Sequence, residues 1–245
     1  MFSDREVERY ARHLVLREIG GPGQQKLKAA SVLLIGAGGI GAPAALYLAA
    51  AGVGRIGIVD DDRVALSNLQ RQVLYGEADI GRPKVEAAAE RLGGLNRDIT
   101  VETFPVRLTA GNARELVRDW DLVLDGADTF ETRLVVSDAC VAEGAGLISA
   151  AIGRWSAMLG LFRGRPCYRC LVAEAPPDPE TCEAVGVVGA LGGAAGSMAA
   201  LIAIRALAGA GEDPTGRVIT LDTLDFSMKS RRVLPDPACP ACAGS

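Results

Sequence analysis

The 245-residue sequence contains a single histidine, His13, and aromatic residues make up only 4% of it. A Ser–His or Cys–His catalytic mechanism would depend on that one histidine, which argues against both mechanisms. The low aromatic content argues against a surface on which nucleic-acid bases stack. A formal net charge of −4 also argues against a general nucleic-acid-binding protein.

Signals for export and for a disulfide-built scaffold are missing as well. The N-terminus, MFSDREVERYAR, is charged and has no apolar signal-peptide core. Six cysteines in a chain of this length do not make a disulfide scaffold. We therefore expect a cytoplasmic protein with reduced thiols.

One uncharged stretch, Ala184 to Ile204, is about as long as a segment that spans a bilayer. It is rich in Gly and Ala rather than in Leu, Ile and Phe, so its insertion into a membrane would be weakly favoured. We therefore predict a buried helix whose small residues allow close packing against a neighbouring element.

The chain is organised around a strand, a glycine turn, a helix and a second strand that ends on an acid. The apolar run Ser31 to Ile35 predicts a buried strand, and an Ala/Leu-rich helix follows to about Ala51. The run Arg55 to Val59 predicts the second strand, which ends on Asp60. The turn contains Gly36, Gly38, Gly39 and Gly41. Such a turn brings backbone and a helix N-terminus close to phosphate, and Asp60 stands where a carboxylate binds ribose.

The residues after Asp60 favour ATP over a dinucleotide. Arg71 and Lys84 are cations on loops beyond a strand end, in the segments SNLQRQ and GRPK. A triphosphate needs cations there, whereas the pyrophosphate of a dinucleotide is usually held by backbone groups. We therefore predict an ATP site. An NAD-dependent oxidoreductase is the weaker alternative, because it gives these two cations no role.

Helices and strands alternate further along the chain. The predicted helices are Gly81 to Leu95, Gly111 to Arg118 and Phe130 to Glu143, and the predicted strands are Ile99 to Phe104, Trp120 to Asp125 and Gly146 to Ile152. This alternation predicts an α/β fold with a doubly wound, Rossmann-like and mainly parallel sheet. Ligands of such sheets bind beyond the carboxyl ends of the strands, where Gly36, Asp60 and the 125–128 segment would converge.

The two ends of the chain complete a predicted single domain, 1–245. Residues 1–30 hold an amphipathic helix, Ser3 to Ile19, with a capping box formed by Ser3 and Glu6. Gly20 to Gly23 would end it, and a short helix, Gln24 to Ala29, would follow. Residues 31–152 are the nucleotide-binding core. Residues 153–245 form a small extension with a strand of a second layer, Trp155 to Phe162, and two antiparallel strands, Arg217 to Asp222 and Phe226 to Val233.

Two interpretations of Asp128, in the segment DGADT, are open. The residue follows the end of a predicted strand by three positions. Its carboxylate would either cap the next helix or form an Asx-turn, or it would bind a magnesium ion beside the ATP phosphates.

The cysteines form two CxxC pairs, Cys167 with Cys170 and Cys239 with Cys242. Four thiolates are the ligand set of a closed tetrahedral structural zinc, which would tie the C-terminal tail to the middle of the domain. Unligated reduced cysteines or a redox pair are the alternatives. Cys140 falls within a predicted helix and is expected in the core.

The motifs GAGGIG, VDDDRVALSNLQRQ, GRPK and LDGADTFETR, together with the CxxC pairs, resemble the ATP-dependent adenylyltransferases that activate ubiquitin-like proteins, such as the bacterial MoeB, ThiF and HesA proteins. The resemblance is greatest to the MoeB type and runs from Tyr10 to Cys242. It implies ATP- and magnesium-dependent adenylation of the C-terminal Gly-Gly carboxylate of a small sulfur-carrier protein, MoaD- or ThiS-like, in molybdopterin, thiamine or related thio-cofactor biosynthesis. It also implies a homodimer and a separate sulfurtransferase.

The resemblance further implies roles for single residues. Arg12, in RYARHL, matches an arginine that reaches the ATP phosphates of the other subunit. Asn68, Arg71 and Lys84 would hold phosphates, and Asp128 would hold magnesium. The whole implied nucleotide site comprises Gly36, Gly38, Gly39, Gly41, Asp60, Asp62, Ser67, Asn68, Arg71, Lys84, Asp128 and Thr129.

Two positions leave the implied activity open. Thr129 stands where the family usually has Asn, which keeps a non-catalytic nucleotide- or carrier-binding relative as an alternative. Cys182, in a Pro- and acid-rich segment expected to be a mobile loop, matches a cysteine with a thioester or sulfur-transfer role in some relatives and not in others. Neighbouring Glu180 and Glu183 disfavour its thiolate, which argues against a strong nucleophile.

Overall fold

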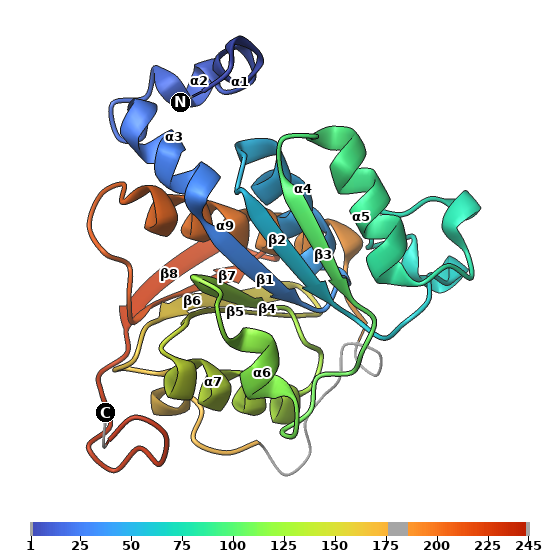
Figure 1. Cartoon of the computed structure of the whole chain (residues 1–245). Helices are drawn as coiled ribbons and strands as arrows, with labels where there is room; N and C mark the ends of the chain where they lie inside the picture. Colours follow the sequence, from blue (N-terminus) through green and yellow to red (C-terminus); the bar gives the residue numbers. More distant parts are fainter. Residues whose placement is uncertain (1, 176–185, 244–245) are drawn as a thin grey trace.

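The computed structural model describes residues 2–175 and 186–243, and the described strands form one eight-stranded sheet (Figure 1). The strands are β1 (Ser31–Ile35), β2 (Arg55–Val59), β3 (Thr100–Phe104), β4 (Leu122–Asp125), β5 (Gly146–Gly153), β6 (Ser156–Phe162), β7 (Arg217–Asp222) and β8 (Ser227–Arg232). Their order is β3-β2-β1-β4-β5-β6-β7-β8; the first five are parallel and the last three pair antiparallel. The predicted doubly wound, mainly parallel fold is therefore confirmed.

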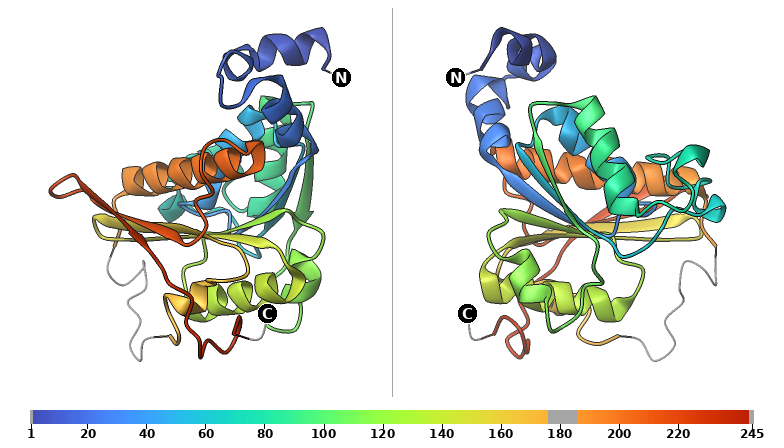
Figure 2. Two further views of the ribbon diagram at one scale, coloured as in Figure 1. Left: turned by 90° about the vertical axis from the view of Figure 1, so that its left-hand side faces the viewer. Right: turned by 45° about the vertical axis from the view of Figure 1, so that its right-hand side comes forward.

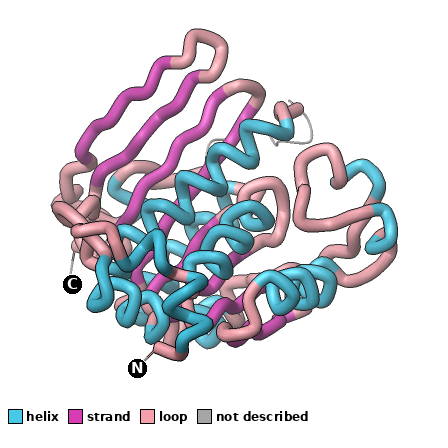
Figure 3. The backbone as a smooth tube through the Cα atoms, turned by 90° about the horizontal axis from the view of Figure 1, so that it is seen from above, coloured by secondary structure: helices cyan, strands magenta, loops and turns pink. Residues whose placement is uncertain are grey.

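Helices cover both faces of this sheet (Figure 2). The α-helices are α1 (Asp4–Arg9), α2 (Ala11–Leu14), α3 (Gly20–Ala29), α4 (Gly41–Ala51), α5 (Lys84–Leu95), α6 (Ala113–Val117), α7 (Phe130–Glu143) and α9 (Gly189–Ala208). Single 3₁₀ turns are η1 (Leu66–Asn68), η2 (Glu77–Asp79) and η3 (Tyr168–Cys170). Helices α4, α5 and α9 lie on one face and α6 and α7 on the other, while the antiparallel strands project at one side of the helical layer (Figure 3).

The central strand β1 shows how the sequence supplies both layers. Val32 and Leu34 are buried in the core that contains α4, α5 and α9. Leu33 and Ile35 point to the opposite side and are buried with α6 and α7. A strand that is covered on both faces must be apolar at every position, which is why β1 reads as a continuous apolar run rather than an alternating one.

The predicted long first helix is wrong, although its capping box is confirmed. The Ser3 hydroxyl accepts from the Glu6 N–H (3.2 Å), and the Glu6 carboxylate accepts from the Ser3 N–H (2.9 Å). The helix breaks at Tyr10, whose backbone leaves the helical region (ψ +12°) and whose side chain is buried. The predicted glycine terminator at 20–23 is also wrong, because these residues form the first turn of α3, where Pro22 requires no hydrogen-bonded N–H.

The position of one strand and the start of one helix also differ from prediction. Strand β6 does not belong to a second layer: a two-residue turn at Arg154 (φ +49°) and Trp155 folds it back onto β5, and Gly153 pairs with Ser156 in the same sheet. Helix α5 begins at Lys84 rather than at Gly81, because Pro83 stands at its N-cap.

Helix α9 packs directly on the loop that follows β1. A Cβ atom added to Gly192 would lie 2.6 Å from the Gly39 carbonyl oxygen, and one added to Gly196 would lie 2.4 Å from the Ile40 carbonyl oxygen. Among the described residues, α9 is the one helix long and apolar enough to cross a membrane, a test that buried core helices also pass. Its packing against the β1–α4 turn agrees with the predicted core helix.

This packing predicts different outcomes for two adjacent glycines. Gly192→Ala should lower the free energy of unfolding by about 1–3 kcal/mol, because the added methyl group overlaps the Gly39 backbone. Gly193→Ala is the matched control, since nothing lies within 4 Å of its added Cβ, and it should stabilise the helix by about 0.5–1 kcal/mol. Urea denaturation measures both values, and equal effects of the two substitutions would contradict the packing.

Candidate functional site

The carboxyl ends of three parallel strands bring the predicted site residues to one edge of the sheet. In the strand registers, Ile35 at the end of β1 pairs with Val59 of β2 on one side and with Asp125 of β4 on the other. The glycine turn, Asp60 and the 125–129 segment therefore follow neighbouring strands, and their predicted convergence is confirmed. Doubly wound sheets bind ligands in the crevice at this edge, and "the crevice" denotes the site formed by the glycine turn, Asp60 and the 125–129 segment.

The glycine turn leads straight into the N-terminus of α4. Gly36 adopts φ +87°, which glycine accepts without strain, and its N–H donates to the Val59 carbonyl (2.9 Å). A Cβ atom on Gly41 would lie 1.9 Å from the Gly36 carbonyl oxygen, so a side chain is excluded there. The turn is thus a bare backbone loop beside the first N–H groups of an 11-residue helix, an arrangement that suits anionic groups.

Asp60 is fastened to the backbone on both sides. Its Oδ2 accepts from the Ala37 N–H (2.8 Å) and its Oδ1 from the Asp62 N–H (2.9 Å). Burial raises the pKa of Asp60, while nearby Lys84 and the two N–H donors favour its ionised form. Each carboxylate oxygen can accept more than one hydrogen bond, so Asp60 can still accept from hydroxyl groups of a ligand.

Lys84 is a buried cation at the first position of α5. Its side chain is only 5% exposed, and its Nζ donates to Asp62 Oδ2 at 2.7 Å, whereas the Asp62 side chain is 67% exposed. The ammonium group has three donors, of which Asp62 uses one. A buried lysine held in place by a solvent-facing carboxylate can exchange that partner for an anionic ligand at small desolvation cost.

Arg71 lies over the glycine turn. A Cβ atom on Gly39 would be 3.6 Å from Arg71 Cγ, and the Arg71 guanidinium donates to the Ser67 carbonyl (3.0 Å). The Asn68 side chain caps its own 3₁₀ turn by accepting from the Ala65 N–H (3.2 Å). The structure therefore brings Arg71 to the glycine turn. Asn68 lies in the same segment, and its side chain is already used in capping the 3₁₀ turn.

The segment after β4 separates the two interpretations of Asp128. Thr129, not Asp128, is the N-cap of α7: its hydroxyl accepts from the Thr132 N–H at 3.2 Å. Asp128 is exposed, and within the described residues its carboxylate makes no hydrogen bond or ion pair. The helix-cap interpretation of Asp128 is therefore wrong. A carboxylate at this edge that is not used in capping is available to a hard cation.

A buried ion pair that was not predicted from the sequence supports this segment. Arg133 Nη1 lies 3.7 Å from Asp125 Oδ2 and donates to the Ala150 carbonyl, while its other nitrogen donates to the Ala127 carbonyl. Asp125 Oδ1 accepts from the Ala127 N–H (2.9 Å). Burial raises the pKa of Asp125, and Arg133 opposes that effect. The ion pair thus holds both backbone groups of the residue before Asp128.

A sequence signal for Arg133 did exist. In α7 it occupies the same face as Val136, Ser137 and Cys140, all of which are buried. A charged residue in an otherwise buried stripe requires a buried partner, and Asp125, which ends an apolar strand, is one candidate for it. Tyr75 was also not identified; its buried hydroxyl donates to the Ala37 carbonyl in the glycine turn (2.9 Å).

The four predicted zinc ligands come together where the C-terminal tail meets η3. Their Sγ atoms all lie within 4.8 Å of one another; Cys167 and Cys239 are 3.6 Å apart, and Cys170 and Cys242 are 3.5 Å apart. The Asp236 N–H donates to Cys170 Sγ at 3.4 Å. Zn–S bonds of about 2.3 Å in a tetrahedron place sulfurs about 3.8 Å apart, so the cluster fits that metal. Cys140 is buried in the core, as predicted.

Two predicted residues lie away from the crevice. Arg12 is exposed on α2, and because α3 leads directly into the start of β1, α2 lies at the amino edge of the sheet, opposite the glycine turn (Figure 1). Within this chain Arg12 is therefore not brought to the crevice. Cys182 lies outside the described residues.

Comparisons with known proteins agree with this arrangement. The model of the ThiF family matches residues 10–241. The chain is 42% identical to the sulfur carrier protein adenylyltransferase of Thermus thermophilus, over 98% of this chain and 92% of that protein, and 42% identical to the SAMP-activating enzyme E1 of Haloferax volcanii, over 97% and 89%. It is 46% identical to the adenylyltransferase and sulfurtransferase MOCS3 of Bos taurus, over 98% of this chain but only 54% of that protein.

Solved structures show the same fold. The crystal structure of E. coli MccB with MccA-N7isoASN superimposes with a TM-score of 0.85 at 25% identity, over 96% of this chain and 74% of that chain. The crystal structure of SeMet PaaA gives a TM-score of 0.81 at 22% identity, over 95% and 75%.

Proposed function

This chain belongs to the ThiF family, and from that membership we infer that it adenylates the C-terminal carboxylate of a small ubiquitin-like sulfur-carrier protein with ATP. The observation that carries the inference is the identity of 42% along nearly the whole length of a relative named as a sulfur carrier protein adenylyltransferase. The crevice supports it, because a glycine turn, Asp60, Lys84 and the 125–129 segment meet at one sheet edge. The protein therefore acts in the biosynthesis of a sulfur-containing cofactor.

The reaction needs neutralised charge and correct positioning more than it needs an acid or a base. The carrier carboxylate attacks the α-phosphate of ATP, an acyl-adenylate forms, and pyrophosphate leaves with the electron pair of the broken P–O bond. In our proposal the backbone from Gly36 to Gly41 approaches the phosphates, Asp60 accepts from ribose hydroxyls, and Arg71 and Lys84 bind the phosphate oxygens. Lys84 would turn from Asp62 toward the nucleotide.

Asp62, Ser67, Asn68 and Thr129 complete the proposed nucleotide site. Asp62 holds Lys84 when no nucleotide is bound, and Ser67 holds Arg71 through its carbonyl. Thr129, where the family usually has Asn, caps α7 with its hydroxyl, a role that either side chain can fill. The relatives named as adenylyltransferases favour adenylation over a non-catalytic role or a nicotinamide reaction.

Magnesium is proposed to bind at Asp128. The residue fits a hard cation because its carboxylate is exposed at the crevice edge and is not used in capping. The bound ion would neutralise phosphate charge. Arg133 and Asp125 keep the Asp128 backbone in place through both polar groups of Ala127.

Arg12 is proposed to complete the site of a partner subunit in a homodimer. It lies on the edge of the sheet opposite its own glycine turn, so it would act on a second chain. The same N-terminal segment exposes Val7, Val15 and Leu16, apolar side chains that a subunit interface would cover. A guanidinium placed on the transferring phosphate would stabilise developing negative charge.

The pathway and the remaining partners are also proposals. Molybdopterin or thiamine biosynthesis suits the sulfur-carrier substrate, and sulfur would come from a separate sulfurtransferase. A role for Cys182 in a later transfer step stays a prediction. ATP is the proposed substrate and is a cytoplasmic metabolite, which is consistent with the expected location.

Carrier-dependent exchange of labelled pyrophosphate into ATP tests the adenylation. We expect exchange with one member of a panel of Gly-Gly carriers, whose mass should increase by one adenylate. Asp128→Ala should reduce exchange at least about 100-fold without lowering the melting temperature, because it removes a phosphate-site charge and no folding contact. Glu131→Ala, an exposed acid in the first turn of α7, is the control. Full exchange by Asp128→Ala would refute the magnesium role.

Mixed dimers test the role of Arg12. Arg12→Ala and Lys84→Ala homodimers should each be nearly inactive. An equal mixture should recover about a quarter of the wild-type exchange rate, because half of the dimers are mixed and each contains one complete site. Copurification through two different affinity tags isolates the mixed dimer. Absence of recovery in that purified species would place Arg12 outside the partner's site.

Elemental analysis tests the metal site. One zinc per chain is expected, bound by Cys167, Cys170, Cys239 and Cys242. Cys242→Ser should lose the zinc and lower the melting temperature, since the metal would tie the tail to η3, whereas Cys140→Ser should retain it. Folded wild-type protein without metal would exclude a structural zinc.

A further inference from the structure

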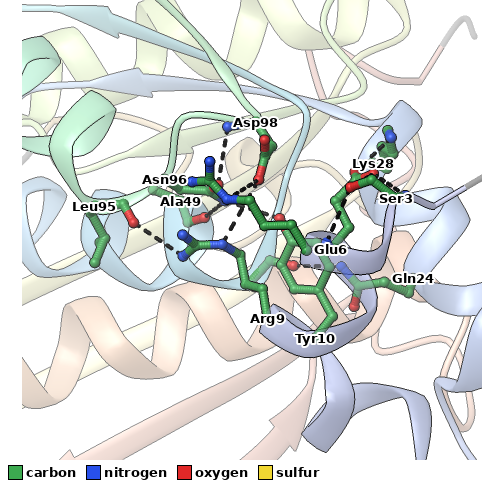
Figure 4. A network of polar contacts seen from close by, with 12 residues as sticks. Ser3, Glu6, Arg9, Tyr10, Gln24, Lys28, Ala49, Leu95, Asn96 and Asp98 are labelled. Carbon is green, nitrogen blue, oxygen red and sulfur yellow. Dashed lines mark hydrogen bonds and ion pairs between the residues drawn. The ribbon is translucent and has the colours of Figure 1, made fainter.

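A buried tyrosine fixes the N-terminal segment to the rest of the molecule (Figure 4). Tyr10, at the break between α1 and α2, accepts a hydrogen bond from Asn96 Nδ2 at 3.0 Å. Asn96 Nδ2 also donates to the Ala49 carbonyl in α4 at 2.7 Å. Tyr10 is 5% exposed and Asn96 is fully buried. The pair thus connects the N-terminal segment to the carboxyl ends of both α4 and α5.

Gly52 leaves room for the Tyr10 hydroxyl. Gly52 follows α4 in the left-handed conformation (φ +80°), and a Cβ atom there would lie 2.4 Å from the Tyr10 hydroxyl oxygen. Any side chain at Gly52 would therefore displace the phenol. The Tyr10 hydroxyl thus occupies space that the Gly52 backbone leaves free for it.

A second buried contact lies on the other side of Arg12. His13 Nδ1 is 2.8 Å from Gln24 Oε1, and the buried Gln24 amide donates to the Ala51 carbonyl (2.8 Å). Arg12 therefore stands between Tyr10 and His13, both of which are tied to the end of α4. Its own side chain is exposed, so the backbone is fixed while the guanidinium is presented outward.

Other contacts also hold this segment. The buried Glu6 carboxylate accepts from Lys28 Nζ at 2.6 Å, and Arg9 donates to the Leu95 carbonyl at 3.1 Å. Arg5 and Arg9 approach Asp98 at 3.7 and 3.9 Å in partly exposed pairs, which contribute little to stability. Helices α1 and α2 have only six and four residues, too few to be stable without tertiary contacts. Among these contacts the Tyr10–Asn96 hydrogen bond is buried and directional and lies two positions before Arg12, so it bears directly on where α2 lies.

We propose that Tyr10 and Asn96 are positioning residues for Arg12: their hydrogen bond sets where α2 presents Arg12 to the crevice of the partner subunit. The inference rests on the proposed function of Arg12 across the dimer. It assigns the two residues to catalysis in the other subunit, although neither touches the nucleotide of either one. Loss of the hydrogen bond lets α2 shift, so the guanidinium no longer meets the transferring phosphate in one geometry.

Tyr10→Phe removes the hydroxyl and keeps the ring over Gly52. Pyrophosphate exchange should fall roughly fivefold to tenfold, the size expected for one neutral hydrogen bond, with the loss in kcat and little change in KM for the carrier. On an Arg12→Ala background the same substitution should cause no further loss, because Tyr10 acts through Arg12. An additive loss would overturn the proposal.

The mixed dimer locates the defect. A Tyr10→Phe subunit paired with a Lys84→Ala subunit has one complete crevice, its own, and that crevice receives Arg12 from the Lys84→Ala subunit, whose N-terminal segment is intact. Exchange per Tyr10→Phe subunit should therefore return to the wild-type rate per site. A rate that stays low would place the defect in the crevice of the Tyr10→Phe subunit itself and would overturn the inference.

Ser31→Ala is the stability control. It removes a different side-chain hydrogen bond, at the amino end of β1, where the Ser31 hydroxyl donates to Asp121 Oδ2 at 2.8 Å. It should lower the melting temperature as Tyr10→Phe does and leave the exchange rate unchanged. A rate loss equal to that of Tyr10→Phe would attribute both effects to general destabilisation and contradict positioning.

The Arg12→Ala mixture separates this inference from the function on which it rests. If Arg12→Ala is rescued by Lys84→Ala and Tyr10→Phe is not, only the positioning role fails. If Arg12→Ala is not rescued either, the role of Arg12 across the dimer fails, and the positioning role fails with it.

Discussion

The backbone of the loop between β1 and α4 packs directly against the backbone of α9 and of the segment after β4, and the rest of the structure depends on this close approach. Gly36 abuts the Gly126 carbonyl, Gly41 leaves no room for a side chain beside Gly36, and Gly192 and Gly196 of α9 rest on the carbonyls of Gly39 and Ile40. Three segments that are far apart in sequence therefore meet without intervening side chains. The absence of side chains at these glycines permits this packing, and it also lets a phosphate chain approach the backbone of the turn.

Charges around this turn are held in pairs. Lys84 and Asp62 form a pair at the crevice surface, whereas Asp125 and Arg133 form one in the interior. The two pairs suit different tasks. A buried pair with further hydrogen bonds to the backbone is costly to separate and holds one geometry. A lysine whose partner faces solvent can exchange it for a phosphate oxygen, which is the behaviour that a nucleotide site requires.

The proposed nucleotide site and Arg12 lie at opposite edges of the sheet, at the carboxyl and amino ends of the parallel strands. The glycine turn, Asp60 and Asp128 follow the carboxyl ends of β1, β2 and β4, while Arg12 lies beyond the amino end of β1. A two-fold dimer can bring such opposite edges together, because each subunit then supplies the element that its partner lacks. Short helices make a suitable donor segment only when buried contacts such as Tyr10–Asn96 restrict them.

Local patterns in the sequence determined the elements whose meaning is local. The βαβ unit, the capping box of Ser3 and Glu6, the carboxylate after β2 and the two CxxC pairs depend on neighbours within a few residues, so spacing alone identifies them. Tertiary structure decided the remainder. The helical pattern around Arg133 indicates that it needs a buried partner but does not say which carboxylate supplies it. Nothing near Tyr10 shows that the helix must break there to reach Asn96, and the alternation in 155–162 does not say which sheet the strand joins. These outcomes depend on contacts that are formed only when the chain packs into one core, such as those of Arg133 with Asp125 and of Tyr10 with Asn96, which are 8 and 86 positions apart.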